Sequence, residues 1–239
     1  MGIKISTQIR RDHLKRAAAR AAVAEIEDGM IVGLGTGTTA HFAIEALGKR
    51  AAEGLGITTV ASSVQSAMAA IEAGLKVVDF EGLESVDICI DGADELDPDL
   101  RAIKGAGGAM LREKIVAAAA ARMIVIVDEE KQVAQLGGQP LPVEVLPFAT
   151  GFVLRQIENL GALVTRRLIE FCPYQTDQQN FILDCKFGSI TEPTALSAQL
   201  SAIPGVLGHG LFLTEVDAAY IGAANGTHRI DRNSSAMRL

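Results

Sequence analysis

Short apolar runs rich in β-branched residues recur along the first half of the chain, each followed by a helical or loop segment. The runs cover residues 31–34, 57–61, 75–79, 86–90 and 123–127. Strands that alternate with helices in this way predict βαβ units and a parallel sheet. The runs are apolar throughout, which is typical of strands covered on both faces. An amphipathic helix is expected before them, over residues 8–27, with Asp28-Gly29 as its end.

The pattern changes near Gly137-Gly138-Gln139-Pro140, where three prolines cluster within eight residues. Beyond it we expect strand 142–146, helix 150–159, strand 162–168, strand 180–185, helix 192–201 and strand 206–214. The order βαββαβ is that of a ferredoxin-like unit, with residues 173–179 as its middle turn. A last apolar run, 218–222, is expected to return to the first sheet, and the polar tail from residue 231 to 239 to be frayed.

The sequence therefore predicts an α/β protein with two domains. Residues 1–138 and 215–239 are expected to form a Rossmann-like, mostly parallel sheet with helices on both faces. Residues 139–214 are expected to form a smaller ferredoxin-like α+β domain.

Composition and charge exclude several classes of protein. The net charge of −7 argues against a nucleic-acid partner, which would require a basic surface. No apolar run reaches the length of about 18 residues that a membrane span needs, and no signal peptide is recognisable. Three widely spaced cysteines suggest small core residues in a reducing compartment, and four scattered histidines offer no ligand-spaced pair for a metal. We expect a cytoplasmic protein.

A glycine- and threonine-rich turn, GLGTGTT at residues 33–39, follows the first predicted strand and leads into a predicted helix at 40–47. Glycines let the backbone approach an anion closely, and the free N–H groups and the dipole of the next helix attract it. The threonine hydroxyls add donors. The turn is therefore expected to bind a phosphate, although a tight strand–helix turn without any ligand would have a similar composition.

The kind of phosphate is narrowed by what the neighbouring sequence lacks. Gly35, Gly37 and Ala40 satisfy the permissive dinucleotide pattern, but one such match alone is unspecific. The second predicted strand ends in residues 60–63, VASS, without the acid that would bind a ribose, and no Gly-Lys-Thr or Gly-Lys-Ser follows the turn. The monophosphate of a small metabolite fits better.

Acidic and basic residues concentrate at 91–115, directly after the fourth predicted strand. Asp91 and Asp94 leave its carboxyl end, the edge at which ligands bind in open α/β sheets. Lys104 follows, and a glycine-rich segment then opens a helix that carries Glu113. A carboxylate in such a pocket can act as a general base because desolvation raises its pKa, and a lysine can stabilise an oxyanion.

Each of these residues also has an ordinary structural explanation. Asp91 or Asp94 could cap a turn, and Glu113 could complement the N-terminus of its helix. The cluster as a whole is harder to explain in this way. Three further acids, Glu95, Asp97 and Asp99, are expected to be solvated loop charges. A metal bound by the acids is disfavoured because no histidine lies nearby in the sequence.

Four segments, in order, resemble the signature segments of the type A family of ribose-5-phosphate isomerases. They are GLGTGTT at 33–39, DGADE at 91–95, KGAGG at 104–108 and REKI at 112–115, with further similarity at 131–132, 140–145, 203–206 and 210–212. Their order and spacing make the resemblance specific over most of the chain. Ala106 and Leu111 depart from it, since the family often has glycine and threonine there.

The resemblance implies reversible conversion of D-ribose 5-phosphate to D-ribulose 5-phosphate through an enediolate, without metal or organic cofactor. It places the reaction in the non-oxidative pentose phosphate pathway, and in the Calvin cycle of a photosynthetic organism. Carried over, Glu113 is the base that moves a proton between C1 and C2, Asp91 assists ring opening, and Lys104 stabilises the enediolate. The residues implied to bind substrate are Thr36, Gly37, Thr38, Thr39, Asp91, Gly92, Ala93, Asp94, Lys104, Gly105, Ala106, Gly107, Lys131 and Lys15. The resemblance also implies a homodimer or homotetramer.

Two other functions remain open from the sequence. A sugar-phosphate sensor without turnover could share the glycine-threonine turn, but such sensors are commonly attached to a DNA-binding helix-turn-helix, and only one helix is expected before the first strand. An acyl or CoA transferase could use a glutamate nucleophile on a similar sheet. Conversion of ribose 5-phosphate without an acyl donor would distinguish the isomerase from both.

Overall fold

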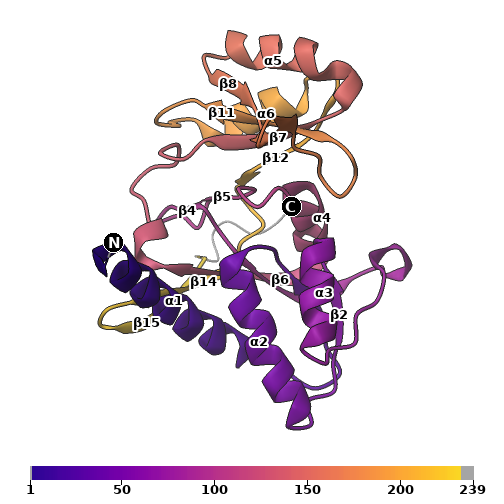
Figure 1. Ribbon diagram of the computed structural model, residues 1–239, viewed down its shortest axis with the longest axis vertical. Coiled ribbons are helices and arrows are strands. Elements are labelled where there is room, and N and C mark those ends of the chain that lie inside the picture. Colours follow the sequence, from indigo (N-terminus) through magenta and orange to yellow (C-terminus); the bar gives the residue numbers. More distant parts are fainter. Residues whose placement is uncertain (1, 233–239) are drawn as a thin grey trace.

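The computed structural model describes residues 2–232 and places most of their strands in two sheets. Figure 1 shows the smaller sheet above the larger one, with helix α4 (Met110–Ala119) between them. The larger sheet consists, in spatial order, of β15 (Gly226–Asp231), β14 (Ala218–Ala223), β6 (Ala120–Asp128), β3 (Val86–Gly92), β1 (Ile31–Leu34) and β2 (Thr58–Ala61). Its neighbours pair in parallel except β14 and β15. The predicted Rossmann-like, mostly parallel sheet is confirmed.

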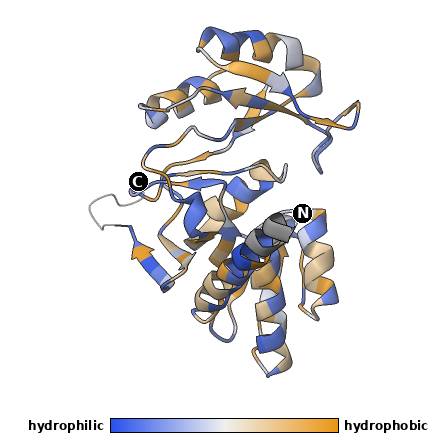
Figure 2. Cartoon of the chain, turned by 60° about the vertical axis from the view of Figure 1, so that its left-hand side comes forward, coloured by the Kyte–Doolittle hydropathy of each residue, from blue (hydrophilic) through white to orange (hydrophobic). Residues whose placement is uncertain are grey.

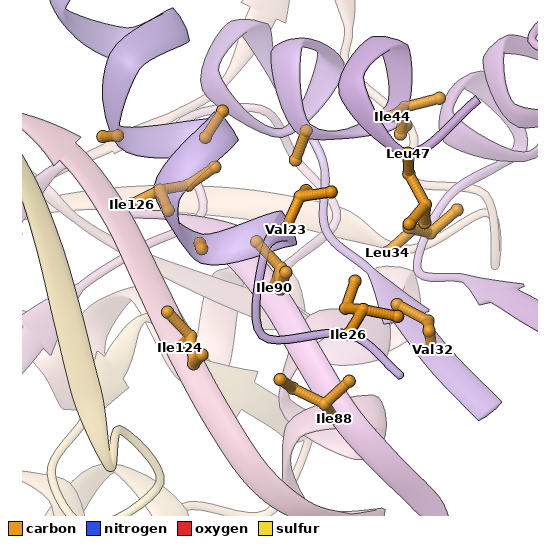
Figure 3. Close-up of a cluster of buried hydrophobic side chains, with 14 of the residues drawn as sticks. Val23, Ile26, Val32, Leu34, Ile44, Leu47, Ile88, Ile90, Ile124 and Ile126 are labelled. Carbon is orange, nitrogen blue, oxygen red and sulfur yellow. The ribbon is translucent and has the colours of Figure 1, made fainter. Parts of the chain in front are cut away.

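Helices cover both faces of this sheet. α1 (Gly2–Val23), α2 (Thr38–Ala52) and α3 (Val64–Glu72) pack on one face, and α4 packs on the other. Successive residues of a strand point to opposite faces, so Ile124 and Ile126 of β6 join the first cluster while Val125 joins the second. Figure 3 shows the first cluster, where isoleucines of β3 and β6 meet side chains of α1 and α2. Two covered faces explain why the strand sequences are apolar throughout.

The smaller sheet has the predicted ferredoxin-like order. Its elements along the chain are β7 (Leu141–Val145), α5 (Thr150–Asn159), β8 (Leu163–Arg166), β11 (Phe181–Lys186), α6 (Pro193–Ser201) and β12 (Val206–His209). The strands lie in the spatial order β12-β7-β11-β8, all antiparallel to their neighbours. Figure 2 shows hydrophilic and hydrophobic residues mixed along the helices that cover the sheets, as amphipathic packing requires. The boundaries predicted at residues 138 and 215 stay a prediction, and the strands of this sheet fall between them.

The prediction of a strand at residues 75–79 is wrong. An isolated bridge joins Val77 to Thr59 there. The N–H of Thr59 donates to the carbonyl oxygen of Lys76, its carbonyl oxygen accepts the N–H of Val78, and the pairing extends no further. The chain then turns away into the short 3₁₀ helix η1 (Phe80–Gly82) and leaves β2 at the edge of the sheet. The first helix also differs from the prediction, since it begins at Gly2 and ends at Val23.

Several short strands were not predicted. The expected strand 206–214 breaks at Gly210, and β13 (Leu211–Phe212) instead joins β5 (Ala102–Ile103) and β4 (Glu95–Leu96) in a three-stranded sheet. The expected strand 162–168 ends at Arg166, and β9 (Leu168–Ile169) pairs with β10 (Cys172–Pro173). β15 was also missed. It includes Asp231, the first residue of the expected frayed tail, and residues 233–239 lie outside the described part of the chain.

None of the helices within residues 2–232 is long and apolar enough to cross a membrane.

The central strand β6 provides a test of the core. Ile126 is completely buried there, whereas Ile71 on α3 is 63% exposed. Ile126→Ala should lower the free energy of unfolding by about 2–5 kcal/mol because it leaves a cavity, and Ile71→Ala by about 0.5 kcal/mol or less. Urea denaturation at one protein concentration, followed by circular dichroism, measures both. Equal losses of stability would contradict this packing.

Candidate active site

The glycine-threonine turn lies at the carboxyl end of β1 and opens α2. Gly37 takes the N-cap position with φ of 98°, a left-handed conformation that favours glycine, and no side chain caps the helix there. The first N–H groups of α2 therefore stay available to an anion. At Gly35 a Cβ atom would lie 1.9 Å from the carboxyl carbon of Asp91, so only glycine lets the turn pass this close to the end of β3.

Three charged side chains meet below this turn. Lys104 Nζ lies 2.7 Å from Asp91 Oδ2 and 3.1 Å from Glu113 Oε2, and it donates a hydrogen bond of 2.6 Å to the carbonyl oxygen of Gly92. Asp91 is in β3, Lys104 follows β5, and Glu113 is in the first turn of α4. All three side chains are at most 3% exposed, so the cluster is a buried group of two carboxyl groups around one ammonium ion.

Burial raises the pKa of Glu113 to about 8, and the adjacent Asp91 charge adds to this shift while Lys104 opposes it. Burial also raises the pKa of Asp91, against the opposing effects of Lys104 and of N–H groups donated by Gly92 and Thr36, at 2.7 and 3.1 Å. Burial alone would lower the pKa of Lys104, but the two carboxylates outweigh it and raise it. The two N–H groups favour the charged form of Asp91, whereas no backbone N–H group opposes the rise in the pKa of Glu113.

A cavity of about 270 Å³ opens beside this cluster. The residues that line it are Lys15, Thr36, Gly37, Thr38, Thr39, Gly92, Ala93, Asp94, Lys104, Gly105, Ala106, Gly107, Glu113 and Lys131. Every residue expected to bind substrate is among them except Asp91, which contacts Lys104 and the turn without lining the cavity. Segments that lie far apart in the sequence therefore form one site.

Two lysines give the cavity a basic wall near the N-terminus of α2. Lys15 comes from α1, and its Nζ donates to the hydroxyl of Thr38 at 3.2 Å. Lys131 comes from the 3₁₀ helix η2 (Glu129–Lys131), which follows β6. Together with the uncapped N–H groups of α2, these cations suit a phosphate.

The sequence did not reveal two serines that support the turn. Thr36 Oγ1 lies 2.9 Å from Ser62 Oγ, and Ser66 Oγ donates to the carbonyl oxygen of Gly35 at 2.7 Å. Both serines are buried in the segment that follows β2. The signal for Ser62 was the sequence VASS at residues 60–63, which places a serine directly after a strand of the same sheet edge. Ser66 lies within α3, where no motif marks it.

The expectation for the three loop acids was wrong in two cases. Glu95 and Asp97 are buried, because Glu95 accepts N–H groups from Gly137 and Gln139 and Asp97 pairs with Arg101. Asp99 is exposed as expected. Asp94 takes part in the site, since its carboxylate accepts the N–H of Ala106 at 2.9 Å.

Within residues 2–232, no three histidine, cysteine, aspartate or glutamate residues lie together in a group that could hold a metal ion. None of the three cysteines forms a disulfide; Cys89 and Cys185 are buried as expected, whereas Cys172 is exposed.

The fold and this cluster define an α/β protein with buried acidic and basic side chains beside a cavity at the carboxyl edge of a parallel sheet. The model of one protein family, described as ribose 5-phosphate isomerase A (phosphoriboisomerase A), matches residues 58–226. The chain belongs to this family, whose members are aldose–ketose isomerases.

Relatives and solved structures agree with the family model. Ribose-5-phosphate isomerase A of Sphingopyxis alaskensis is 51% identical over 207 residues, which are 87% of this chain and 91% of the relative. The enzyme of that name from Methanothermobacter thermautotrophicus is 48% identical over 90% of this chain and 96% of its own. A solved D-ribose-5-phosphate isomerase in complex with phospho-erythronic acid has a TM-score of 0.90 at 36% identity and covers 93% of this chain and 99% of its own. The Plasmodium falciparum ribose 5-phosphate isomerase has a TM-score of 0.89 at 29% identity, with the same coverage.

The raised pKa of Glu113 predicts how Glu113→Gln changes stability with pH. Below the ordinary pKa of 4.5 the carboxyl is protonated in both the folded and the unfolded state. Between 4.5 and about 8 the unfolded chain loses this proton while the folded protein keeps it, so the wild type loses stability as pH rises. The melting temperature of Glu113→Gln relative to wild type should therefore rise across this interval and level off above it.

Differential scanning calorimetry at several pH values measures this difference. Glu158→Gln, on the exposed face of α5, is the matched control and should show no such pH dependence. A difference between Glu113→Gln and wild type that stays constant from pH 4.5 to 8 would show that Glu113 has an ordinary pKa.

Proposed function

We propose that this protein interconverts D-ribose 5-phosphate and D-ribulose 5-phosphate through an enediolate, with Glu113 as the general base. One observation carries the proposal. Glu113 is a buried carboxyl 3.1 Å from Lys104, and both line a cavity that also has a basic wall. Such a site combines an anion anchor with a base and with a positive charge for an oxyanion.

The anchor comes first in the mechanism. Lys15, Lys131 and the N-terminus of α2 bind the phosphate, which fixes the open sugar chain with its other end toward Glu113. Holding the reacting carbons against the base replaces a bimolecular encounter by an oriented, intramolecular one. Binding energy from the phosphate, which takes no part in the reaction, thereby accelerates the proton transfer.

Proton transfer then proceeds at adjacent carbons. Glu113, as the carboxylate, removes the proton from C2 of the aldose, and the electron pair of that bond forms the C1–C2 double bond while the carbonyl oxygen O1 gains negative charge. Lys104 stabilises this enediolate. A proton moves from O2 to O1, with Asp91 assisting at the sugar oxygens, and Glu113 returns its proton to C1 to give the ketose.

The pKa of about 8 suits this role. A base whose pKa lies near the working pH is ionised in a useful fraction of molecules and still has the strength to abstract a carbon-bound proton. Asp91, which accepts N–H groups from Thr36 and Gly92, stays in place behind Lys104 and keeps the lysine charged.

The relative in complex with phospho-erythronic acid supports this assignment. That molecule carries a phosphate at one end and a carboxylate at the other. Transferred to this chain, the phosphate would meet the basic wall and the carboxylate would meet Lys104, as the two oxygens of an enediolate would. The family also favours the isomerase over a sensor or an acyl transferase.

The proposal includes the setting of the reaction. The carbonyl and hydroxyl carbons exchange oxidation level within one molecule, so the reaction needs no external electron acceptor and we propose no cofactor. We further propose a place in the non-oxidative pentose phosphate pathway, a cytoplasmic location and a homodimer or homotetramer, as the family resemblance implies.

Replacement of the base tests the proposal directly. Glu113→Gln keeps the size of the side chain but cannot accept a proton, so the rate of isomerisation should fall by about 10²–10⁴-fold while phosphosugar binding survives. Ketose formation measures the rate, and calorimetric titration with ribose 5-phosphate measures binding. Glu158→Gln on the surface of α5 should behave as wild type. A Glu113→Gln variant that keeps more than about a tenth of the rate would refute the assigned base.

Chelation tests the expectation that no metal takes part. Isomerisation should be unchanged after incubation with EDTA, because Lys104 supplies the positive charge that would otherwise fall to a metal ion. Activity that is lost on chelation and returns with a divalent cation would contradict this mechanism.

A further inference from the structure

The smaller sheet reaches the loop that forms one wall of the cavity. Arg167, which follows β8, extends its guanidinium to the backbone of that loop. Its Nη1 atom donates to the carbonyl oxygens of both Gly105 and Ala106, each at 3.0 Å. A side chain outside the Rossmann-like sheet thus binds two consecutive peptides of the site.

This arginine is itself held firmly. Asp184 of β11 accepts hydrogen bonds from Arg167 Nε at 2.9 Å and from Nη2 at 2.5 Å, which is the bidentate arrangement that fixes a guanidinium in one plane. The backbone N–H of Arg167 bonds to the carbonyl oxygen of Ile182 at 2.8 Å. The guanidinium therefore has one orientation, set by the sheet.

A second contact joins the same two parts of the chain. Tyr174 bonds to the carbonyl oxygen of Arg167 through its backbone N–H, at 3.0 Å, and its ring packs against Gly108. A Cβ atom at Gly108 would lie 2.1 Å from the hydroxyl oxygen of Tyr174, and the φ of 83° also favours glycine at this position. Arg167 and Tyr174 together therefore contact the loop of residues 105–108 that forms this wall of the cavity.

The contacts of Arg167 and Tyr174 with this loop matter because of where the loop lies. Lys104 directly precedes it, and Glu113 lies in the first helical turn after it. Its peptides are held from both sides, since Asp94 accepts the N–H of Ala106 while Arg167 binds the carbonyl of the same residue. A rotation of these peptides would move the two charged side chains relative to each other and would admit water between them.

We propose that Arg167 is a positioning residue for the reaction, through which the smaller sheet fixes the loop between Lys104 and Glu113. The inference rests on the isomerase function proposed above. It assigns the ferredoxin-like unit a part in the chemistry beyond its own packing.

Three variants and a matched control test this inference. Arg167→Ala removes both carbonyl bonds, Arg167→Lys keeps a charge that cannot form the fork, and Asp184→Asn weakens the support of the guanidinium. The control is Arg166→Ala, which removes the same charge one residue earlier, from an exposed side chain that lies over the ring of Phe181. Each is assayed with ribose 5-phosphate, well below its own melting temperature.

We expect Arg167→Ala to lower kcat by about 10- to 100-fold, because small displacements of reacting groups have effects of this size. Arg167→Lys should recover part of the loss, and Asp184→Asn should fall between Arg167→Ala and wild type. The acidic limb of the kcat/KM profile should also move to lower pH in Arg167→Ala, since water that enters the cluster stabilises the charged form of Glu113. Arg166→Ala should match wild type in all these respects.

The possible failures are distinguishable. A wild-type protein that forms no ketose would refute the isomerase function itself. Active wild type with Arg167→Ala equal to Arg166→Ala would overturn the positioning role alone. A loss of activity that follows only the folded fraction, with an unchanged pH profile, would show that Arg167 merely joins the two sheets and would also overturn it. If Arg167→Ala does not fold, Arg167→Lys and Asp184→Asn decide by the same measurements.

Discussion

The structure depends on the burial of two carboxyl groups around one ammonium ion. Asp91, Glu113 and Lys104 lie almost completely out of contact with water, where the loss of hydration costs several kcal/mol for each charge. Mutual attraction offsets this cost only while the groups stay within hydrogen-bond distance. Burial and the neighbouring Asp91 charge disfavour the charged form of Glu113, which raises its pKa to about 8. Groups with pKa values shifted toward neutrality are typical of sites that transfer protons.

The rest of the fold holds this cluster from several directions. β3 delivers Asp91 to the carboxyl edge of the parallel sheet, and Gly35 lets the neighbouring turn approach its carboxylate. The first turn of α4 delivers Glu113, and α4 contacts strands of both sheets. The loop that joins Lys104 to α4 is bound by Arg167 from the smaller sheet. Residues of both sheets therefore make contacts that hold the elements of the site in place.

The sequence was sufficient to predict the sheets and the cavity residues where the local hydrophobic pattern and the residue chemistry indicate the same structure. Apolar runs predicted both sheets, and the glycine-rich turn and the acidic segment predicted the residues of the cavity, because the ends of parallel strands meet at one edge. Prediction from the sequence failed where contacts with residues distant in the sequence determine burial or strand ends. Glu95 is buried because N–H groups of Gly137 and Gln139 reach it, and the expected strand 206–214 breaks where Gly210 packs against the carbonyl of Lys104. Arg167 lay in the expected strand 162–168 with no motif around it, so only the structure could connect it to the site.

The most direct test of this account is the ionisation of Glu113 itself. Carbon-13 NMR of protein labelled at the glutamate carboxyl carbons can follow each resonance with pH, and the signal missing from Glu113→Gln identifies the residue. The account predicts a midpoint near 8 for this carboxyl. A midpoint at the ordinary value of 4.5 would mean that burial does not disfavour the charged form of this side chain, and would contradict the central claim.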